Sequence, residues 1–85
     1  MINLQVKNMK RVYEILGTIL EEMIFNPDGP AFTIEKRIRI LHQGNIIDRT
    51  EFEWTEIFLK GRPEAQSVNR SDLEELISTA RRLEV

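Results

Sequence analysis

The sequence predicts an all-α fold, a compact four-helix domain, and three observations lead to that prediction. Apolar residues recur at spacings of three and four along two long segments, which is the period of an amphipathic helix. Capping patterns precede apolar runs at two places where helices would begin. A turn rich in proline and glycine separates the first helix from the rest of the chain. We expect helices near residues 7–25, 33–43, 49–60 and 71–83.

The first helix is predicted by the longest apolar stripe, whose members alternate in spacing between four and three: Ile2, Val6, Met9, Tyr13, Leu16, Leu20 and Met23. Asn3 and Asn8 are both candidate N-caps. Residues 2–6 also alternate as a short strand would. Gly17 lies beside the stripe, so we expect a neighbouring helix to approach closely there. The Asn-Pro-Asp-Gly-Pro turn at 26–30 ends the helix.

The segment 33–43 fits either a helix or a strand. As a helix, Thr33 caps its start, Gly44 ends it, and one apolar face forms from Ile34, Ile38 and Leu41. As a strand, Ile34, Ile38 and Ile40 share a face instead. The alternative is therefore an α+β fold in which a β-hairpin at about 32–59 lies between two helices. Its turn falls at Gly44-Asn45, where a three-residue loop gives an acceptable register.

Local signals favour a helix over 49–60. Asp48 and Glu51 form a capping-box pattern, and Ile47 and Phe52 occupy the two positions of a hydrophobic staple. Gly61 then stands at the position that commonly follows a helix. These signals agree with one another, so we favour the helical interpretation over the hairpin.

The last helix is predicted by a second capping box, formed by Ser71 and Glu74. One apolar face follows it, made of Leu73, Leu76, Ile77, Ala80 and Leu83. The segment 62–70 before this helix is polar and is interpreted as a surface connection.

Length and composition set bounds on the class of protein. The 85 residues are enough for one domain spanning 1–85. The chain has no cysteine, which excludes disulfides and thiolate metal sites. No apolar run approaches the roughly 20 residues of a membrane span, and the N-terminal residues lack the pattern of a signal peptide. We therefore expect no membrane partner and a cytoplasmic location.

Reactive groups are few. The chain holds one histidine, His42, and its four glycines are isolated rather than gathered in a phosphate-binding loop. A catalytic site needs a nucleophile held against a base, and no spacing in the sequence indicates one. We therefore expect a protein that is not an enzyme and that binds no cofactor or metal.

Aromatic residues indicate a binding surface. On a helix over 49–60, Phe52 and Leu59 fall on one side, while Trp54, Ile57 and Phe58 fall on another. Two apolar sectors mean that the helix is central to the domain or that one sector meets another chain. The sequence thus predicts a small protein-protein interaction or regulatory module that forms a homodimer or a larger assembly. The candidate partner-binding residues are Trp54, Phe58, Ile57, Met9, Leu16 and Met23.

The alternative function is a small nucleic-acid-binding regulator that uses a basic helix. Its candidate residues are Lys36, Arg37, Arg39, Arg49, Lys60 and Arg62. Two short helices around Gly44 superficially suggest a helix-turn-helix. However, the net charge is −2, and the second helix would carry Glu51, Glu53 and Glu56. These carboxylates oppose phosphate binding, so we place this hypothesis second.

Overall fold

The computed structural model describes residues 5–83, and within that range it contains four α-helices, one 3-10 turn and no strand. In chain order the elements are α1 (Val6–Phe25), α2 (Ile34–Gln43), α3 (Arg49–Leu59), η1 (Pro63–Gln66) and α4 (Arg70–Leu83). The all-α prediction is confirmed. The α+β alternative is wrong, because the segment 32–59 folds as two helices rather than as a hairpin.

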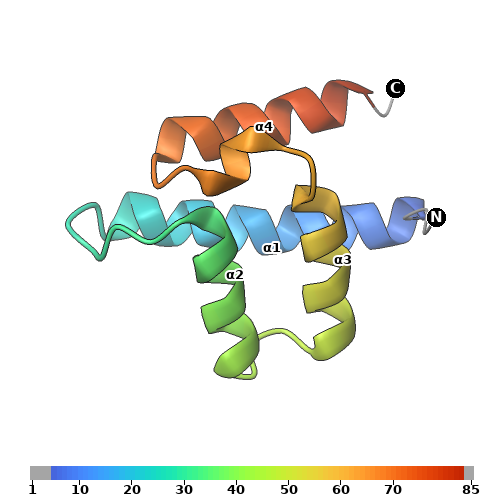
Figure 1. Cartoon of the computed structure of the whole chain (residues 1–85), viewed down its shortest axis with the longest axis horizontal. Coiled ribbons are helices and arrows are strands. Elements are labelled where there is room, and N and C mark those ends of the chain that lie inside the picture. The colour runs from blue at the N-terminus through green and yellow to red at the C-terminus, as the bar shows by residue number, and fades with distance from the viewer. Residues whose placement is uncertain (1–4, 84–85) are drawn as a thin grey trace.

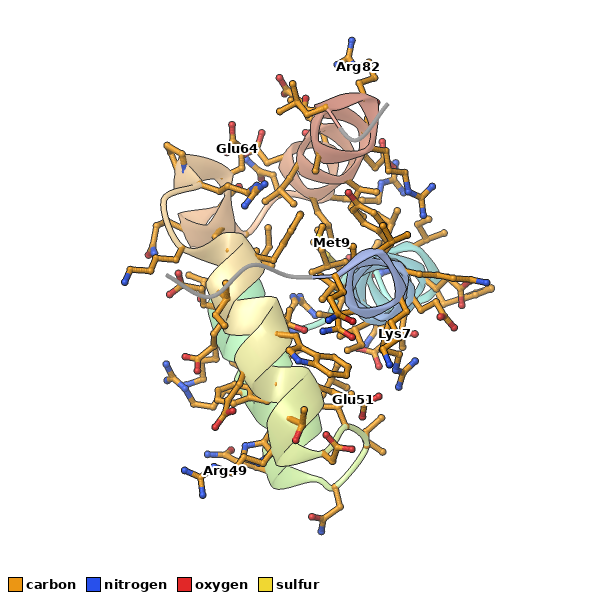
Figure 2. The ribbon with its side chains drawn as sticks, turned by 90° about the vertical axis from the view of Figure 1, so that its right-hand side faces the viewer. Lys7, Met9, Arg49, Glu51, Glu64 and Arg82 are labelled. Carbon is orange, nitrogen blue, oxygen red and sulfur yellow. The ribbon has the colours of Figure 1, made fainter. Side chains whose placement is uncertain are left out.

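The helices pack around α1, which runs along the length of the molecule (Figure 1). α2 and α3 lie side by side with opposite chain directions and cross α1 at one side (Figure 1). α4 covers a second side of α1, and the short η1 turn contacts both α2 and α4. Viewed along α1, the α2–α3 pair and α4 form two arms about it (Figure 2).

The N-cap position of α1 lies three residues before the Asn8 cap that the sequence suggested. Gln5 is its N-cap residue and makes no side-chain capping hydrogen bond, while its carbonyl oxygen accepts a hydrogen bond from the Met9 N–H at 2.9 Å. The first residue of the helix, Val6, is 88% exposed, so this end is held by neither a polar cap nor apolar burial of Val6. Asn3 and most of the alternating segment 2–6 lie outside the described residues.

The helical period explains why α2 is not a strand. A helix places Ile34, Ile38 and Leu41 on one face, and all three are buried. A strand would instead have buried Ile40, which is 40% exposed, and turned Leu41 outward. The predicted cap is confirmed, since Thr33 Oγ1 accepts a hydrogen bond from the Lys36 N–H at 3.1 Å. Beyond the helix, Asn45 takes the left-handed conformation that reverses the chain.

The capping box of α3 is confirmed in both directions. Asp48 Oδ1 accepts a hydrogen bond from the Glu51 N–H at 2.8 Å, and Glu51 Oε1 accepts one from the Asp48 N–H at 3.0 Å. The staple residue Ile47 is buried. Gly61 has φ +80°, the left-handed conformation expected after a helix end.

Two predictions near α4 need correction. α4 begins at Arg70 rather than after Ser71, which is an exposed residue inside the helix. Ser67 organises this start instead: its Oγ accepts a hydrogen bond from the Asn69 N–H at 3.0 Å and donates one to the Asp72 carboxylate. The preceding segment is also more than a surface connection, because η1 buries Ala65 completely.

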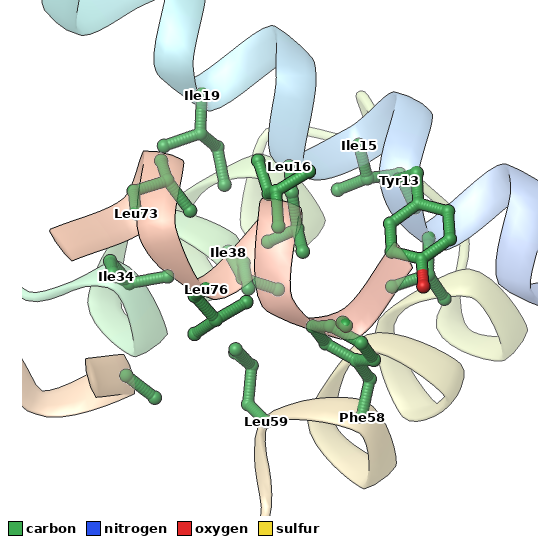
Figure 3. Packing of buried hydrophobic residues seen from close by; sticks show 14 of the residues in the cluster. Tyr13, Ile15, Leu16, Ile19, Ile34, Ile38, Phe58, Leu59, Leu73 and Leu76 are labelled. Carbon is green, nitrogen blue, oxygen red and sulfur yellow. The ribbon is translucent and has the colours of Figure 1, made fainter. Parts of the chain in front are cut away.

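The core collects buried side chains from all four α-helices and from η1 (Figure 3). Tyr13 of α1 meets Phe58 of α3 edge to face, with ring centroids 5.8 Å apart. Leu73 of α4 lies beside Ile19 of α1, and Leu76 of α4 points toward the side of the cluster where Leu59 lies (Figure 3). The expectation of a close helix approach at Gly17 is wrong, because a Cβ atom there would meet nothing within 4 Å.

Candidate functional site

Most side chains of the apolar stripe of α1 are buried in the core or pack against it. Leu16 is fully buried and Met23 is 8% exposed, so both are core residues rather than surface residues. Met9 is half-buried and packs against the same cluster, on the side of α1 opposite Lys7 (Figure 2). From Met9 to Met23 the stripe therefore packs inside the subunit, whereas Val6 at the start of α1 is 88% exposed.

The predicted aromatic sector of α3 is divided between core and surface. Phe58 is a core residue, 2% exposed, and belongs to the contact with Tyr13. Trp54 is half-buried and packs against the edge of the core. Ile57 is also half-buried and lines a surface groove. Of these three candidates, Trp54 and Ile57 keep a surface that another molecule can contact.

That groove lies between α2 and α3 and has a volume of about 370 Å³. Its apolar lining consists of Ile38, Phe52, Ile57 and Leu59, and its charged lining consists of Glu35, Arg39, Glu56 and Lys60. No residue of α1 or α4 contributes to this lining. We call these eight residues the α2–α3 groove.

The pairing of α2 with α3 fixes which charges face one another across the α2–α3 groove. The His42 ring stacks on the Phe52 ring, with centroids 4.6 Å apart and planes inclined by 13°. Because the two helices are antiparallel, one turn back along α2 corresponds to one turn forward along α3. Arg39 therefore lies level with Glu56. One further turn places Glu35 level with Lys60.

The charges of the α2–α3 groove are mostly unpaired. Within residues 5–83, the side chains of Arg39, Glu56 and Lys60 form no ion pair and no hydrogen bond. Glu35 accepts one hydrogen bond, from Gln66 Nε2 at 3.0 Å. The groove thus carries two acids and two bases at alternating corners, around an apolar floor.

Most of the basic residues that suggested nucleic-acid binding have partners inside the fold. Arg37 donates from Nη2 to the Pro30 carbonyl oxygen at 2.8 Å, and the Lys36 Nζ lies 5.3 Å from the Phe32 ring centroid. Arg62 donates to the Phe58 carbonyl oxygen and lies over that ring. Arg49 forms an ion pair with Glu53, with Nε and Oε1 3.2 Å apart. Only Arg39 and Lys60 of the set lack such a contact in the described chain, and both line the α2–α3 groove.

The geometry of α2 and α3 also differs from a helix-turn-helix. In that motif the two helices meet at roughly 90–120°, whereas α2 and α3 lie side by side (Figure 1). Glu51, on the helix that would enter the groove of DNA, instead faces α1 (Figure 2). The nucleic-acid alternative stays a prediction that binding measurements must test.

Glu51 connects α3 to α1, an interaction that no local sequence pattern indicates. Its Oε2 accepts a hydrogen bond from Arg11 Nε, 40 residues away in the chain. This hydrogen bond lowers the pKa of Glu51 below its usual 4.5, the Asp48 N–H lowers it further, and burial opposes both effects. The ion pair therefore fixes the start of α3 against α1, on the side away from the α2–α3 groove.

A second groove lies between α1 and α4. Its volume is about 460 Å³, and it is lined by Leu20, Glu74, Ile77, Ser78, Arg81 and Arg82. Only two of these six side chains are apolar, and the Arg81 guanidinium lies over the Tyr13 ring at 4.9 Å from its centroid. Of those two apolar side chains only Leu20 is half-buried, whereas Phe52 and Ile57 are both half-buried in the α2–α3 groove, which therefore offers the stronger contact surface.

Residues 5–83 offer neither a metal-binding cluster nor a membrane-spanning helix. That part of the chain holds no cluster of three or more His, Asp or Glu side chains able to bind a metal ion. None of its helices has the combined length and apolar character that crossing a membrane requires. Compared with protein-family models, with curated proteins and with solved structures, the chain shows no significant match.

Proposed function

We propose that this chain is a protein-binding module that acts by contact rather than by catalysis, through the α2–α3 groove. The observation that carries the proposal is the combination of two half-buried apolar side chains, Phe52 and Ile57, above the core residues Ile38 and Leu59. Charged rims flank them, and the side chains of Arg39, Glu56 and Lys60 in these rims have no partner within residues 5–83. An apolar centre inside a polar rim is the usual anatomy of a protein-protein interface.

The residues of the groove suit a protein ligand. Phe52 and Ile57 are half-buried, so covering them removes apolar surface from water at little cost in side-chain entropy. One rim of the groove carries Glu35 and Arg39, and the other carries Glu56 and Lys60. A protein segment that bears both signs of charge can form ion pairs with each rim. A regulatory role and a cytoplasmic location, both expected from the sequence, remain predictions attached to this proposal.

Affinity capture with matched variants tests the proposal. The tagged chain is incubated with lysate of the source cell and with an untagged copy of itself, and bound proteins are identified. The test variant is Ile57→Glu, which puts a charge into the groove. The control is Ile46→Glu, because Ile46 is 64% exposed in the α2–α3 connection and lies outside the groove. Circular dichroism verifies that both variants remain helical.

We expect Ile57→Glu to lose a protein that the parent chain and Ile46→Glu both retain. The proposal fails if the two variants capture the same proteins as the parent. It also fails if the parent captures neither another protein nor its untagged copy.

A further inference from the structure

We infer that the occupant of the α2–α3 groove is a second copy of this chain, docked face to face on the same groove. This inference rests on the proposed function and names its partner. Its basis is the arrangement of four charges: Glu35 and Arg39 on α2, Glu56 on α3, and Lys60 at the C-cap position of α3. Each corner of this rectangle bears the opposite sign to its two neighbours.

Such an arrangement complements itself in a symmetric dimer. Homodimers form mostly around two-fold axes, so the same patch must match its own rotated image. When two copies meet face to face, the two-fold axis lies in the plane between them and runs along the groove or across it. In both cases every charged corner meets a corner of opposite sign on the other copy.

The two axes bring different residues together. An axis along the groove sets Arg39 against Glu56 of the second copy, and Glu35 against its Lys60. An axis across the groove sets Arg39 against Glu35 of the second copy, and Glu56 against its Lys60. Each arrangement creates four intermolecular ion pairs from side chains of which only Glu35 has a hydrogen-bond partner in the described subunit.

The rest of the groove agrees with this occupant. The four corner charges sum to zero, so the patch does not repel its own copy although the chain carries a net charge of −2. A strongly acidic or basic partner would leave half of the corners facing like charge, which disfavours it. Face-to-face docking also covers Phe52 and Ile57 of both copies at once, which adds apolar burial to the ion pairs.

The test measures the dimer dissociation constant by sedimentation equilibrium for the full chain and for single charge reversals. Arg39→Glu and Glu56→Arg each create like-charge contacts under either axis. We expect each to weaken dimerisation about tenfold or more. The matched controls are Arg49→Glu and Glu53→Arg, which make the same changes on the exposed side of α3 outside the groove. We expect the controls to dimerise like the parent chain.

Mixing two variants restores the contact and identifies the axis. An equimolar mixture of Arg39→Glu with Glu56→Arg forms a mixed dimer with all four pairs intact only if the axis runs along the groove. A mixture of Arg39→Glu with Glu35→Arg does so only if the axis runs across it. Recovery of parent-like affinity in one of the two mixtures is the expected result.

The inference is overturned if the parent chain stays monomeric at millimolar concentration, if the single reversals dimerise as strongly as the controls, or if neither mixture recovers. A monomeric parent whose groove variant Ile57→Glu still loses another captured protein would remove the second copy as partner and leave the proposed function standing. A parent chain that neither dimerises nor captures another protein would remove the proposed function as well.

Discussion

Replacing Glu51 with alanine tests how α3 is fixed against α1. The carboxylate of Glu51 has two partners: Oε1 accepts the Asp48 N–H at 3.0 Å, and Oε2 accepts Arg11 Nε. Glu51→Ala removes both interactions and leaves the start of α3 without one half of its capping box. The Glu51 side chain is 19% exposed and that of Arg11 is 37% exposed, so water screens this ion pair only in part.

The expected loss follows from the two interactions. A hydrogen bond contributes about 0.5–1.5 kcal/mol net, and a partly exposed ion pair contributes about 0.2–1 kcal/mol. Glu51→Ala should therefore lower the free energy of unfolding by about 1–2 kcal/mol. In a domain of this size, each kcal/mol lowers the melting temperature by about 4–8 °C.

Urea denaturation followed by the fluorescence of Trp54, the single tryptophan, measures this loss. The matched control is Glu53→Ala, which removes a carboxylate two residues away whose ion pair with Arg49 is exposed. We expect the control to cost no more than about 0.5 kcal/mol. Equal losses for the two variants would refute the reasoning, because they would mean that contact with α1 adds nothing to the Glu51 side chain.

The same interactions make stability depend on pH. The hydrogen bond from Arg11 and that from the Asp48 N–H hold the pKa of Glu51 below its usual 4.5 in the folded state. The carboxylate therefore stabilises the fold above its unfolded-state pKa, and that contribution is lost as pH falls through the lower, folded-state pKa. We expect the parent chain to lose more stability than Glu51→Gln between neutral pH and about pH 3. Parallel pH profiles for the two proteins would contradict this assignment.

Three further predictions follow from single positions. Gly17→Ala should stabilise the fold by about 0.4–1 kcal/mol in urea denaturation, because a Cβ meets nothing within 4 Å; destabilisation would reveal an unseen neighbour. Asn45→Val should cost about 1 kcal/mol or more, because φ is 60° and a β-branched side chain disfavours that conformation; an unchanged urea midpoint would contradict this. Because Arg37 and Arg62 have partners inside the fold, fluorescence anisotropy should detect no binding of duplex DNA at low salt. Affinity that falls steeply with salt would instead favour the nucleic-acid alternative.

Much of the fold was predictable because its signals are local. The period of buried residues and the caps at Thr33 and Asp48 lie within a few residues of the helix starts that they define. The Ser71 cap was wrong because a residue outside the predicted capping box, Ser67, makes the hydrogen bonds at the start of α4. Ser67 donates to the Asp72 carboxylate, and its position depends on how η1 folds, which no local pattern indicates. Residues 62–70 are polar overall, which concealed the burial of Ala65.

The candidate site was less predictable because it depends on contacts between helices. The aromatic cluster correctly directed attention to α3, and Ile57 does line a groove. Helical period could not decide which sector of α3 faces the core, so Phe58 was a candidate partner-binding residue although it is buried. The rim charges Arg39 and Lys60 were noticed only as bases. Their relation to Glu35 and Glu56 exists only once α2 and α3 lie side by side.

The most direct test of self-association through the α2–α3 groove is a dilution series of ¹⁵N-labelled protein followed by two-dimensional NMR. Face-to-face docking predicts concentration-dependent shifts at the amides of the groove residues, including Arg39, Phe52 and Ile57. The amides of Lys7 and Lys10, exposed residues of α1, should stay unchanged. Spectra that do not change with concentration, or changes confined to the groove between α1 and α4, would contradict this docking.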